Sequence, residues 1–236
     1  PQPKARPKTD KVTPRSLLAD VREAVRYIVT WRGLFLLVLM ASLLNMFLAP
    51  GINLLPLHVT GFFGKGVREL ALLQVAMGIG GIVGGLWLGV WGGFKRRVWT
   101  VLLGIIGLGA GMLAFGLVPA DRYTLSLVGL GMIGLMASLA NGSLGPLMQT
   151  KVPSEVQGRV FMLLSSLTLA MMPIGLFLSA PIADHFGTQV SYIVGGSACL
   201  IIGIVGMMNK HVKTLDLQKE GGALITGEDI SPPVEN

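Results

Sequence analysis

Six long apolar runs dominate the chain, and a short polar stretch separates each run from the next. They cover about residues 34–57, 70–92, 98–118, 123–149, 160–182 and 189–208. A helix needs about 20 mostly apolar residues to cross the roughly 30 Å hydrocarbon core of a membrane. No run carries Asp, Glu, Lys or Arg in its middle, where a charge costs about 3 kcal/mol. The pattern therefore predicts an all-α membrane protein with six transmembrane helices.

The composition excludes an ordinary soluble domain. Hydrophobic residues make up 52% of the chain and charged residues only 13%, with a mean hydropathy of +0.68, whereas soluble domains carry about 25% charged residues. The net charge of +7 comes from basic residues that flank the apolar runs. They form no basic stripe with aromatic residues between, so we expect no nucleic-acid partner.

Cysteine and histidine do not suggest a metal or cofactor. The single Cys199 allows neither a disulfide within the chain nor a metal site made of paired thiols. We interpret His58 and His185 as interfacial polar residues at span ends and His211 as part of the tail, because none has the spacing of a metal ligand.

The distribution of positive charge predicts how the spans are oriented. All but three of the 19 Lys and Arg residues lie in the N-terminal segment, the second and fourth connections, or the C-terminal tail. The three on the opposite side are Lys65, Arg68 and Arg122. Because cytoplasmic loops carry the excess of Lys and Arg, we expect a multi-pass protein of the cell (inner) membrane with both ends in the cytoplasm.

The flanking segments complete the predicted domain organisation. We expect a basic linker over 1–15, an amphipathic helix at the cytoplasmic interface over 16–32, the six-span domain over 33–208 and a flexible cytoplasmic tail over 209–236. A soluble helix packed on another domain remains the alternative for 16–32. A start at Pro1 without an initiator Met is typical of a segment excised from a longer protein.

The first and fourth spans contain an internal repeat. Residues 41–53 read ASLLNMFLAPGIN and residues 137–149 read ASLANGSLGPLMQ, with six identities at an offset of 96. Because three spans separate the copies, the two helices cross the membrane in opposite senses. This arrangement predicts a 3+3 inverted repeat, which in many transporters places the substrate site at the repeat interface.

Each copy of the repeat carries a polar stripe and a proline. At about 100° per residue the polar positions fall on one helix face, which would be poorly placed against lipid. Pro50 and Pro146 each remove a backbone donor and are predicted to kink their helices. We interpret the stripes as lining a substrate pathway, with interhelical hydrogen bonding without substrate as the alternative. The predicted pathway residues are Ser42, Asn45, Asn53, Ser138, Asn141 and Gln149.

One segment superficially resembles a hydrolase motif. Residues 141–145 nearly match a nucleophile elbow, but Gly142 and Ser143 are adjacent where a spacer should stand, and no strand precedes them. We therefore predict that the protein is not an enzyme.

Three motifs carry a resemblance to a known family. They are VPSEVQGRV at 152–160, PIADHFG at 181–187 and GGFKRR at 92–97. On these motifs the chain resembles spans seven to twelve of a major facilitator superfamily transporter. More narrowly, it is similar to the bacterial branch with the macrolide efflux proteins and the enterobactin exporter. The loop motif at 92–97 lacks the usual Asp, so the ion pair that goes with it is not expected here.

The resemblance implies half of a twelve-span fold, with an N-terminal six-span half as partner and a cavity lined by the first and fourth spans. It further implies a secondary active efflux permease or antiporter that exports drugs, macrolides or siderophores by alternating access. Protons are the expected coupling ion, although no carboxylate lies within these spans. A non-transporting scaffold or partner subunit remains the alternative.

The cytoplasmic connections are predicted to act as a gate or as an anchor. The basic cluster can bind anionic headgroups, and a carboxylate and a guanidinium four residues apart can pair on a helix. The resemblance implies a gate latch, and a topology anchor is the simpler interpretation. The residues concerned are Lys95, Arg96, Arg97, Glu155 and Arg159.

Overall fold

A computed structural model of the chain describes residue 29 and residues 31–152 and 154–213, without the side chains of 154–156. The predicted linker over 1–15, nearly all of the predicted interfacial helix over 16–32, and the tail beyond 213 lie outside the described residues.

The described part of the chain is helical and contains no strand. Six of its helices are long and apolar enough to cross a membrane, which confirms the predicted fold class. In the first of these spans, α2, α3 and the π-helix η1 follow one another from Arg32 to Phe62. The helices are α2 (Arg32–Asn53), α3 (Leu55–Leu57), η1 (His58–Phe62), α4 (Val67–Trp91), α5 (Arg97–Gly116), α6 (Tyr123–Lys151), α7 (Ser154–Phe186), α8 (Thr188–Met208) and α9 (Lys210–Lys213).

The fifth helix extends beyond its predicted end. The apolar run was expected to end at about residue 182, but α7 continues through Pro181 to Phe186. The chain reverses at Gly187, whose φ of +85° lies in the region that favours glycine. Gly92 and Gly93 have φ of +74° and +76° and similarly reverse the chain between α4 and α5.

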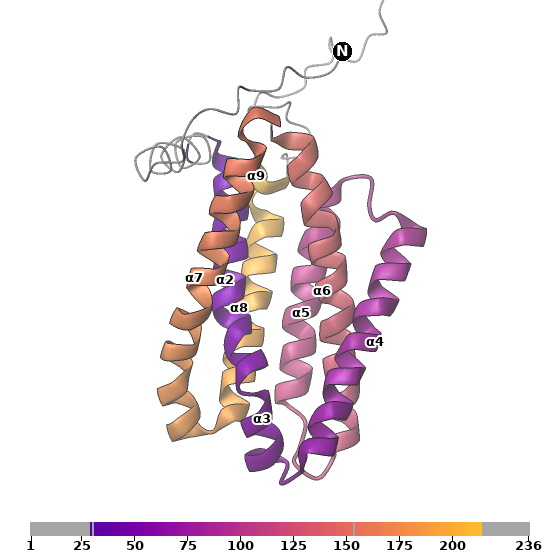
Figure 1. Cartoon of the computed structure of the whole chain (residues 1–236), viewed down its shortest axis with the longest axis vertical. Helices are drawn as coiled ribbons and strands as arrows, with labels where there is room; N and C mark the ends of the chain where they lie inside the picture. Colours follow the sequence, from indigo (N-terminus) through magenta and orange to yellow (C-terminus); the bar gives the residue numbers. More distant parts are fainter. Residues whose placement is uncertain (1–28, 30, 153, 214–236) are drawn as a thin grey trace, which may run out of the picture.

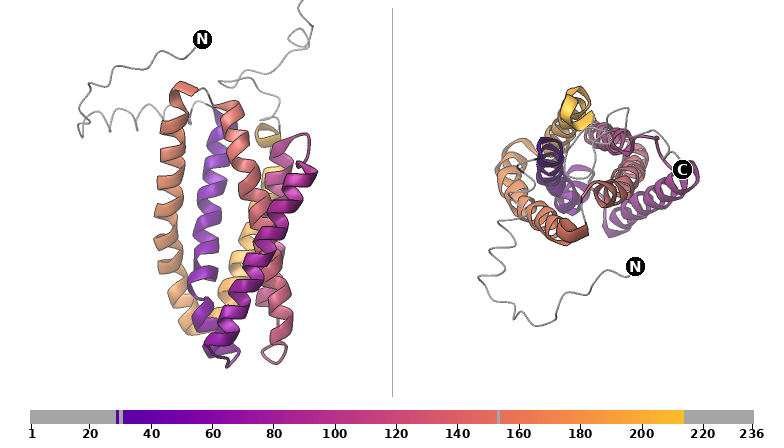
Figure 2. Two further views of the ribbon diagram at one scale, coloured as in Figure 1. Left: turned by 45° about the vertical axis from the view of Figure 1, so that its right-hand side comes forward. Right: turned by 90° about the horizontal axis from the view of Figure 1, so that it is seen from above.

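The six spans form two groups of three. Helices α4, α5 and α6 pack together, as do α2, α7 and α8, and the contact between α5 and α8 joins the groups. Figures 1 and 2 show these groups side by side. Each group takes two helices from one half of the sequence and one from the other, as expected if the first and fourth spans are exchanged between two repeats.

The contact between α5 and α8 is reciprocal. A Cβ placed on Gly109 would lie 2.7 Å from the backbone nitrogen of Leu200, and a Cβ on Gly196 would lie 2.7 Å from that of Leu113. The two glycines are 87 residues apart in the sequence, and so are the two leucines. Gly116 and Gly203 are also 87 residues apart, and they pack against Ile193 and Ile106 respectively. The two helices therefore run antiparallel and use equivalent surfaces, as an inverted repeat requires.

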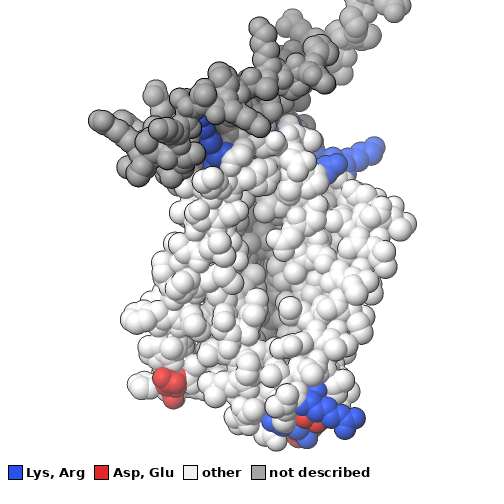
Figure 3. Space-filling view, viewed as in Figure 1, with Lys and Arg blue, Asp and Glu red and all other residues white. Residues whose placement is uncertain are grey.

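Described charged residues lie at the two ends of the bundle, and the part of the surface between them seen in Figure 3 is uncharged. The basic end holds the start of α2, the α4–α5 connection and α9, so both ends of the described chain lie there (Figure 1). It carries Arg32, Lys95, Arg96, Arg97, Lys151, Arg159, Lys210 and Lys213. The opposite end carries Lys65, Arg68, Glu69, Asp121, Arg122 and Asp184.

Candidate functional site

A cavity of about 280 Å³ lies between the two groups of helices. Its walls come mainly from α2, α5, α6 and α7, and most of its lining side chains are aliphatic. The surface is hollowed between α7 and α6 in Figure 3. The polar residues of the lining are Asn45, Asn141, Ser165 and Thr168.

The two asparagines occupy equivalent positions on α2 and α6. Asn45 Nδ2 donates to Ala41 O at 2.9 Å and Asn141 Nδ2 donates to Ala137 O at 3.0 Å. Each amide thus uses one donor on its own helix, and within the described residues its carbonyl oxygen has no donor. The cavity walls are therefore apolar, with two amide acceptors that a ligand can reach.

The neighbours of the two asparagines also line the cavity in pairs. Leu44 and Ala140 are one such pair at the offset of 96, and Leu48 and Leu144 are another. The repeat between the first and fourth spans is thus present in the walls of one cavity.

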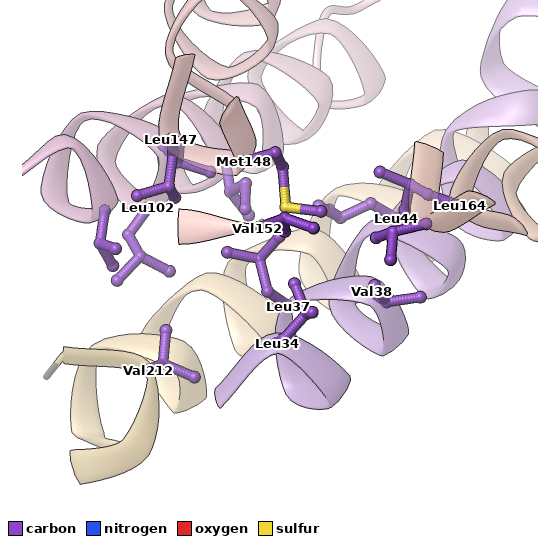
Figure 4. Close-up of a cluster of buried hydrophobic side chains, with 14 of the residues drawn as sticks. Leu34, Leu37, Val38, Leu44, Leu102, Leu147, Met148, Val152, Leu164 and Val212 are labelled. Atoms are coloured by element: carbon purple, nitrogen blue, oxygen red, sulfur yellow. The ribbon is translucent and has the colours of Figure 1, made fainter. Parts of the chain in front are cut away.

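A buried apolar cluster packs the helices together at the basic end of the cavity. Figure 4 shows residues of α2, α5, α6, α7 and α9 pointing toward one another in this cluster. Val212, from the short α9, is 1% exposed there and also lines the cavity. The cluster includes Leu34, Leu37, Val38, Leu102, Leu147, Met148, Val152, Leu164 and Val212.

The other predicted pathway residues do not line this cavity. Ser42 is buried and donates to Val38 O, and the exposed Asn53 donates to Ala49 O. Ser138 donates instead across to Gly81 O on α4 at 2.7 Å, because glycine at that position lets the two helices approach closely. Gln149 is exposed near the basic end of α6.

The predicted kink residues lie inside their helices. Pro50 is buried in α2 and Pro146 is half-buried in α6. Pro50 has no N–H to donate to Met46 O, and Gly175 of α7 lies against this carbonyl, since a Cβ there would be 1.9 Å from it. A glycine on α7 therefore allows α7 to cover the carbonyl that Pro50 leaves without its helical donor.

The predicted gate or anchor residues lie at the basic end. Lys95, Arg96 and Arg97 are exposed at the α4–α5 connection. Residues 154–159 are helical, so Glu155 and Arg159 have the four-residue spacing that pairing requires, although the side chain of Glu155 is not described. Lys213 Nζ lies 5.9 Å from the ring centroid of Trp99, which connects α9 to the start of α5.

The structure gives no support for catalysis at residues 141–145. Ser143 lies inside α6 and is 5% exposed, so it does not sit on a strand-to-helix turn as a nucleophile elbow requires. In the described ranges, no group of three or more His, Cys, Asp or Glu residues could hold a metal ion.

Sequence reasoning missed three polar positions. Ser165 and Thr168 line the cavity from α7, and their spacing of three residues on a helix is a signal that could have identified them. His58 was interpreted as an interfacial residue, but it is 0% exposed. The π-helix that begins at His58 brings it under Phe62 and Phe63, and the sequence alone does not predict such a turn.

Comparison with known proteins identifies relatives among bacterial efflux proteins. The chain is 29% identical over 203 residues to macrolide efflux protein A of Streptococcus pyogenes, a match that covers 86% of this chain and 50% of that protein. It is 27% identical over 161 residues to macrolide efflux protein A of Enterococcus faecalis, covering 68% and 50%. It is 30% identical over 149 residues to the multidrug efflux pump Tap of Mycolicibacterium fortuitum, covering 63% and 36%.

No family model and no solved structure matches the chain. The chain spans about half the length of the macrolide efflux proteins that it matches. Six apolar spans and these relatives together establish a multi-pass membrane protein. The resemblance to the macrolide efflux branch is confirmed: the chain is a relative of bacterial macrolide and multidrug efflux proteins.

Proposed function

We propose that this chain forms one half of a secondary exporter that moves amphipathic small molecules across the cell (inner) membrane by alternating access. The observation that carries the proposal is the cavity between the two helix groups, where Asn45 and Asn141 of the two repeats meet apolar walls. A partner half of six spans would complete the cavity. With both ends cytoplasmic, the basic end of the bundle would face the cytoplasm.

The chemistry of the lining favours neutral amphipathic substrates over anionic siderophores. No Lys or Arg lines the cavity in the described part of the chain, so nothing there would pair with an anionic ligand. The aliphatic walls would bind a large apolar surface, and the two amides would orient the polar groups of the substrate. Among the described residues no Asp or Glu lines the cavity, so a carboxylate that carries the coupling proton would belong to the partner half.

The first prediction replaces both cavity amides. We expect Asn45→Leu with Asn141→Leu to lower drug efflux by the complete transporter in vesicles under a pH gradient by about tenfold or more. A loss of about 1.4 kcal/mol of polar interaction, of the order of one or two hydrogen bonds, corresponds to a tenfold change. The midpoint of thermal unfolding should change little, because the amides bond only within their own helices.

Asn53→Leu is the matched control, because Asn53 makes the same bond to its own helix and lies outside the cavity. It should export at the normal rate. Unchanged efflux in the double variant would contradict the assignment of the cavity. An absence of efflux by the complete wild-type protein under the pH gradient would favour the alternative of a membrane scaffold or partner subunit.

A further inference from the structure

A buried histidine lies at the end of the bundle opposite the basic end. His58 is 0% exposed and is surrounded by four aromatic rings, which we call the aromatic cage. Two of the rings come from the end of η1 and the residue after it, one comes from α5 and one from α8. Phe62 stacks on the imidazole with a centroid distance of 4.7 Å. Phe63, Phe115 and Tyr192 have their centroids at 5.0, 5.3 and 4.8 Å.

The imidazole has one polar partner. Its Nδ1 lies 2.7 Å from Thr188 Oγ1, at the start of α8. Its Nε2 is buried and, among the described residues, has no hydrogen-bond partner. We assign the neutral ring as the Nε2–H tautomer, in which the Thr188 hydroxyl donates to Nδ1, because the described residues offer this hydroxyl no other acceptor.

The His58–Thr188 bond joins the end of the first span to the start of the sixth. Two further bonds connect the same region, because Tyr192 donates to Gly51 O at 2.7 Å and Gln189 Nε2 donates to Gly116 O at 2.8 Å. Both of these use backbone acceptors, which do not titrate. His58 is thus the acid-sensitive connection in this set, and it begins a π-helix, a feature that often marks functional sites.

We propose that His58 is a proton-binding site, and that proton binding loosens the contact between η1 and α8 at this end of the bundle. The proton adds to Nδ1 and removes the lone pair that accepts from Thr188. The hydroxyl would have to turn and leave its own proton without an acceptor, while Nε2–H stays unpaired. The proposal goes beyond export and does not depend on it.

The groups around His58 destabilise the positively charged imidazole more than they stabilise it. The aromatic faces attract a cation, but this attraction is smaller than the cost of burying an unpaired charge. The other titratable groups at the cage are Tyr192 of α8 and Tyr123 of α6, which packs edge-on against Phe63 at 5.7 Å. Within the described ranges no carboxylate pairs with the imidazole, so no charge at this site compensates for the proton.

The second prediction measures thermal unfolding of the full chain in nanodiscs at pH 8 and pH 5. An unfolded histidine binds a proton below about pH 6.5. Because proton binding is coupled to loosening of the cage, stability is present at high pH and is lost as the pH falls. We expect the midpoint of the wild type to fall by roughly 2–4 °C or more between the two conditions. His58→Gln should remove most of this difference.

His185→Gln and His211→Gln are the controls, because both residues are exposed, and they should keep the full difference. An equal fall in His58→Gln would overturn the proposal. A rise of the wild-type midpoint in acid would also overturn it, because the cage would then be holding the cation.

A local readout tests the loosening itself. In a Cys199→Ala background, Ser191→Cys places a thiol where the native side chain is 5% exposed, and Thr60→Cys places one where it is exposed. The ratio of their labelling rates cancels the pH dependence of the reagent. This ratio should rise several-fold from pH 8 to pH 5 when His58 is present and stay flat in His58→Gln. Thr188→Val, which removes only the hydrogen bond, should raise it at both pH values, and a flat ratio with His58 present would refute the site.

Discussion

At the scale of single residues, glycine decides how closely the helices approach. A Cβ on Gly80 would lie 1.9 Å from Gly131 O, and one on Gly84 would lie 2.4 Å from Leu135 O. These close approaches bring α4 against the backbone of α6, where Ser138 then reaches Gly81 O. Small residues at helix contacts allow such packing in membranes, where van der Waals contact replaces the hydrophobic effect as the driving force.

The third prediction compares two glycines on α4. Gly80→Ala should destabilise the chain by about 1–3 kcal/mol, because a backbone carbonyl cannot move aside as a flexible side chain can. Gly78→Ala is the matched control, since its Cβ would meet nothing within 4 Å, and alanine is the better helix former. Thermal unfolding in nanodiscs provides the measurement. Equal midpoints for the two variants would show that α4 and α6 do not pack this closely.

At the scale of elements, the shortest helix contributes more packing than its length suggests. α9 has four residues, three of them Lys or His, and its one apolar side chain is Val212. Val212 is buried in the cluster that closes the basic end of the cavity. The contact between Lys213 and Trp99 connects the same helix to α5. α9 therefore closes part of the cavity wall from outside the six spans.

The fourth prediction concerns Val212→Ala. Removing two buried methyl groups should cost about 2 kcal/mol, at about 0.8 kcal/mol for each buried carbon. The same change should increase the labelling of a cysteine introduced at Leu102, which packs in the same cluster. His211→Ala on the exposed face of α9 should affect neither measurement. The role of α9 in closing the cavity would be refuted if both variants label alike.

At the scale of the whole molecule, the contact between α5 and α8 relates the two halves of the sequence. Gly109 and Gly196 make equivalent contacts with Leu200 and Leu113. Because this contact is reciprocal, the group of three helices on one side of it can pack in the same way as the group on the other side. The contacts of α4 with α6 and of α2 with α7 fit this relation. Each of them joins the first span of one repeat to the second span of the other repeat.

The fifth prediction uses this equivalence. Gly109→Ala and Gly196→Ala should lower the unfolding midpoint by similar amounts, because each new Cβ meets a backbone nitrogen at 2.7 Å. The double variant should cost less than the sum, since the first substitution already separates the helices and contacting sites are not additive. Gly85→Ala, whose Cβ meets nothing within 4 Å, should leave the midpoint nearly unchanged. Additive losses would contradict a shared contact.

Much of the architecture could be predicted from local sequence. Span number and approximate boundaries follow from apolar run length, because each helix must satisfy its own backbone in lipid. The segregation of Lys and Arg to one end follows equally directly. Asn45 and Asn141 could be paired because their repeat is visible at an offset of 96. A second match, at an offset of 87 between α5 and α8, is also present in the sequence, in Gly109, Leu113 and their equivalents, but sequence reasoning did not identify it.

The sequence by itself determined the six spans and the end at which Lys and Arg gather, because both depend on the free energy of transferring a segment between water and lipid. It also determined which two amides meet at one cavity, because they occupy equivalent positions of a visible repeat. Only the tertiary structure decided that Ser138 faces α4 and that His58 is enclosed by aromatic rings. In lipid every face of an apolar helix is tolerated. Which face meets a neighbour therefore depends on close packing between segments far apart in the chain, and hydropathy carries no record of that packing.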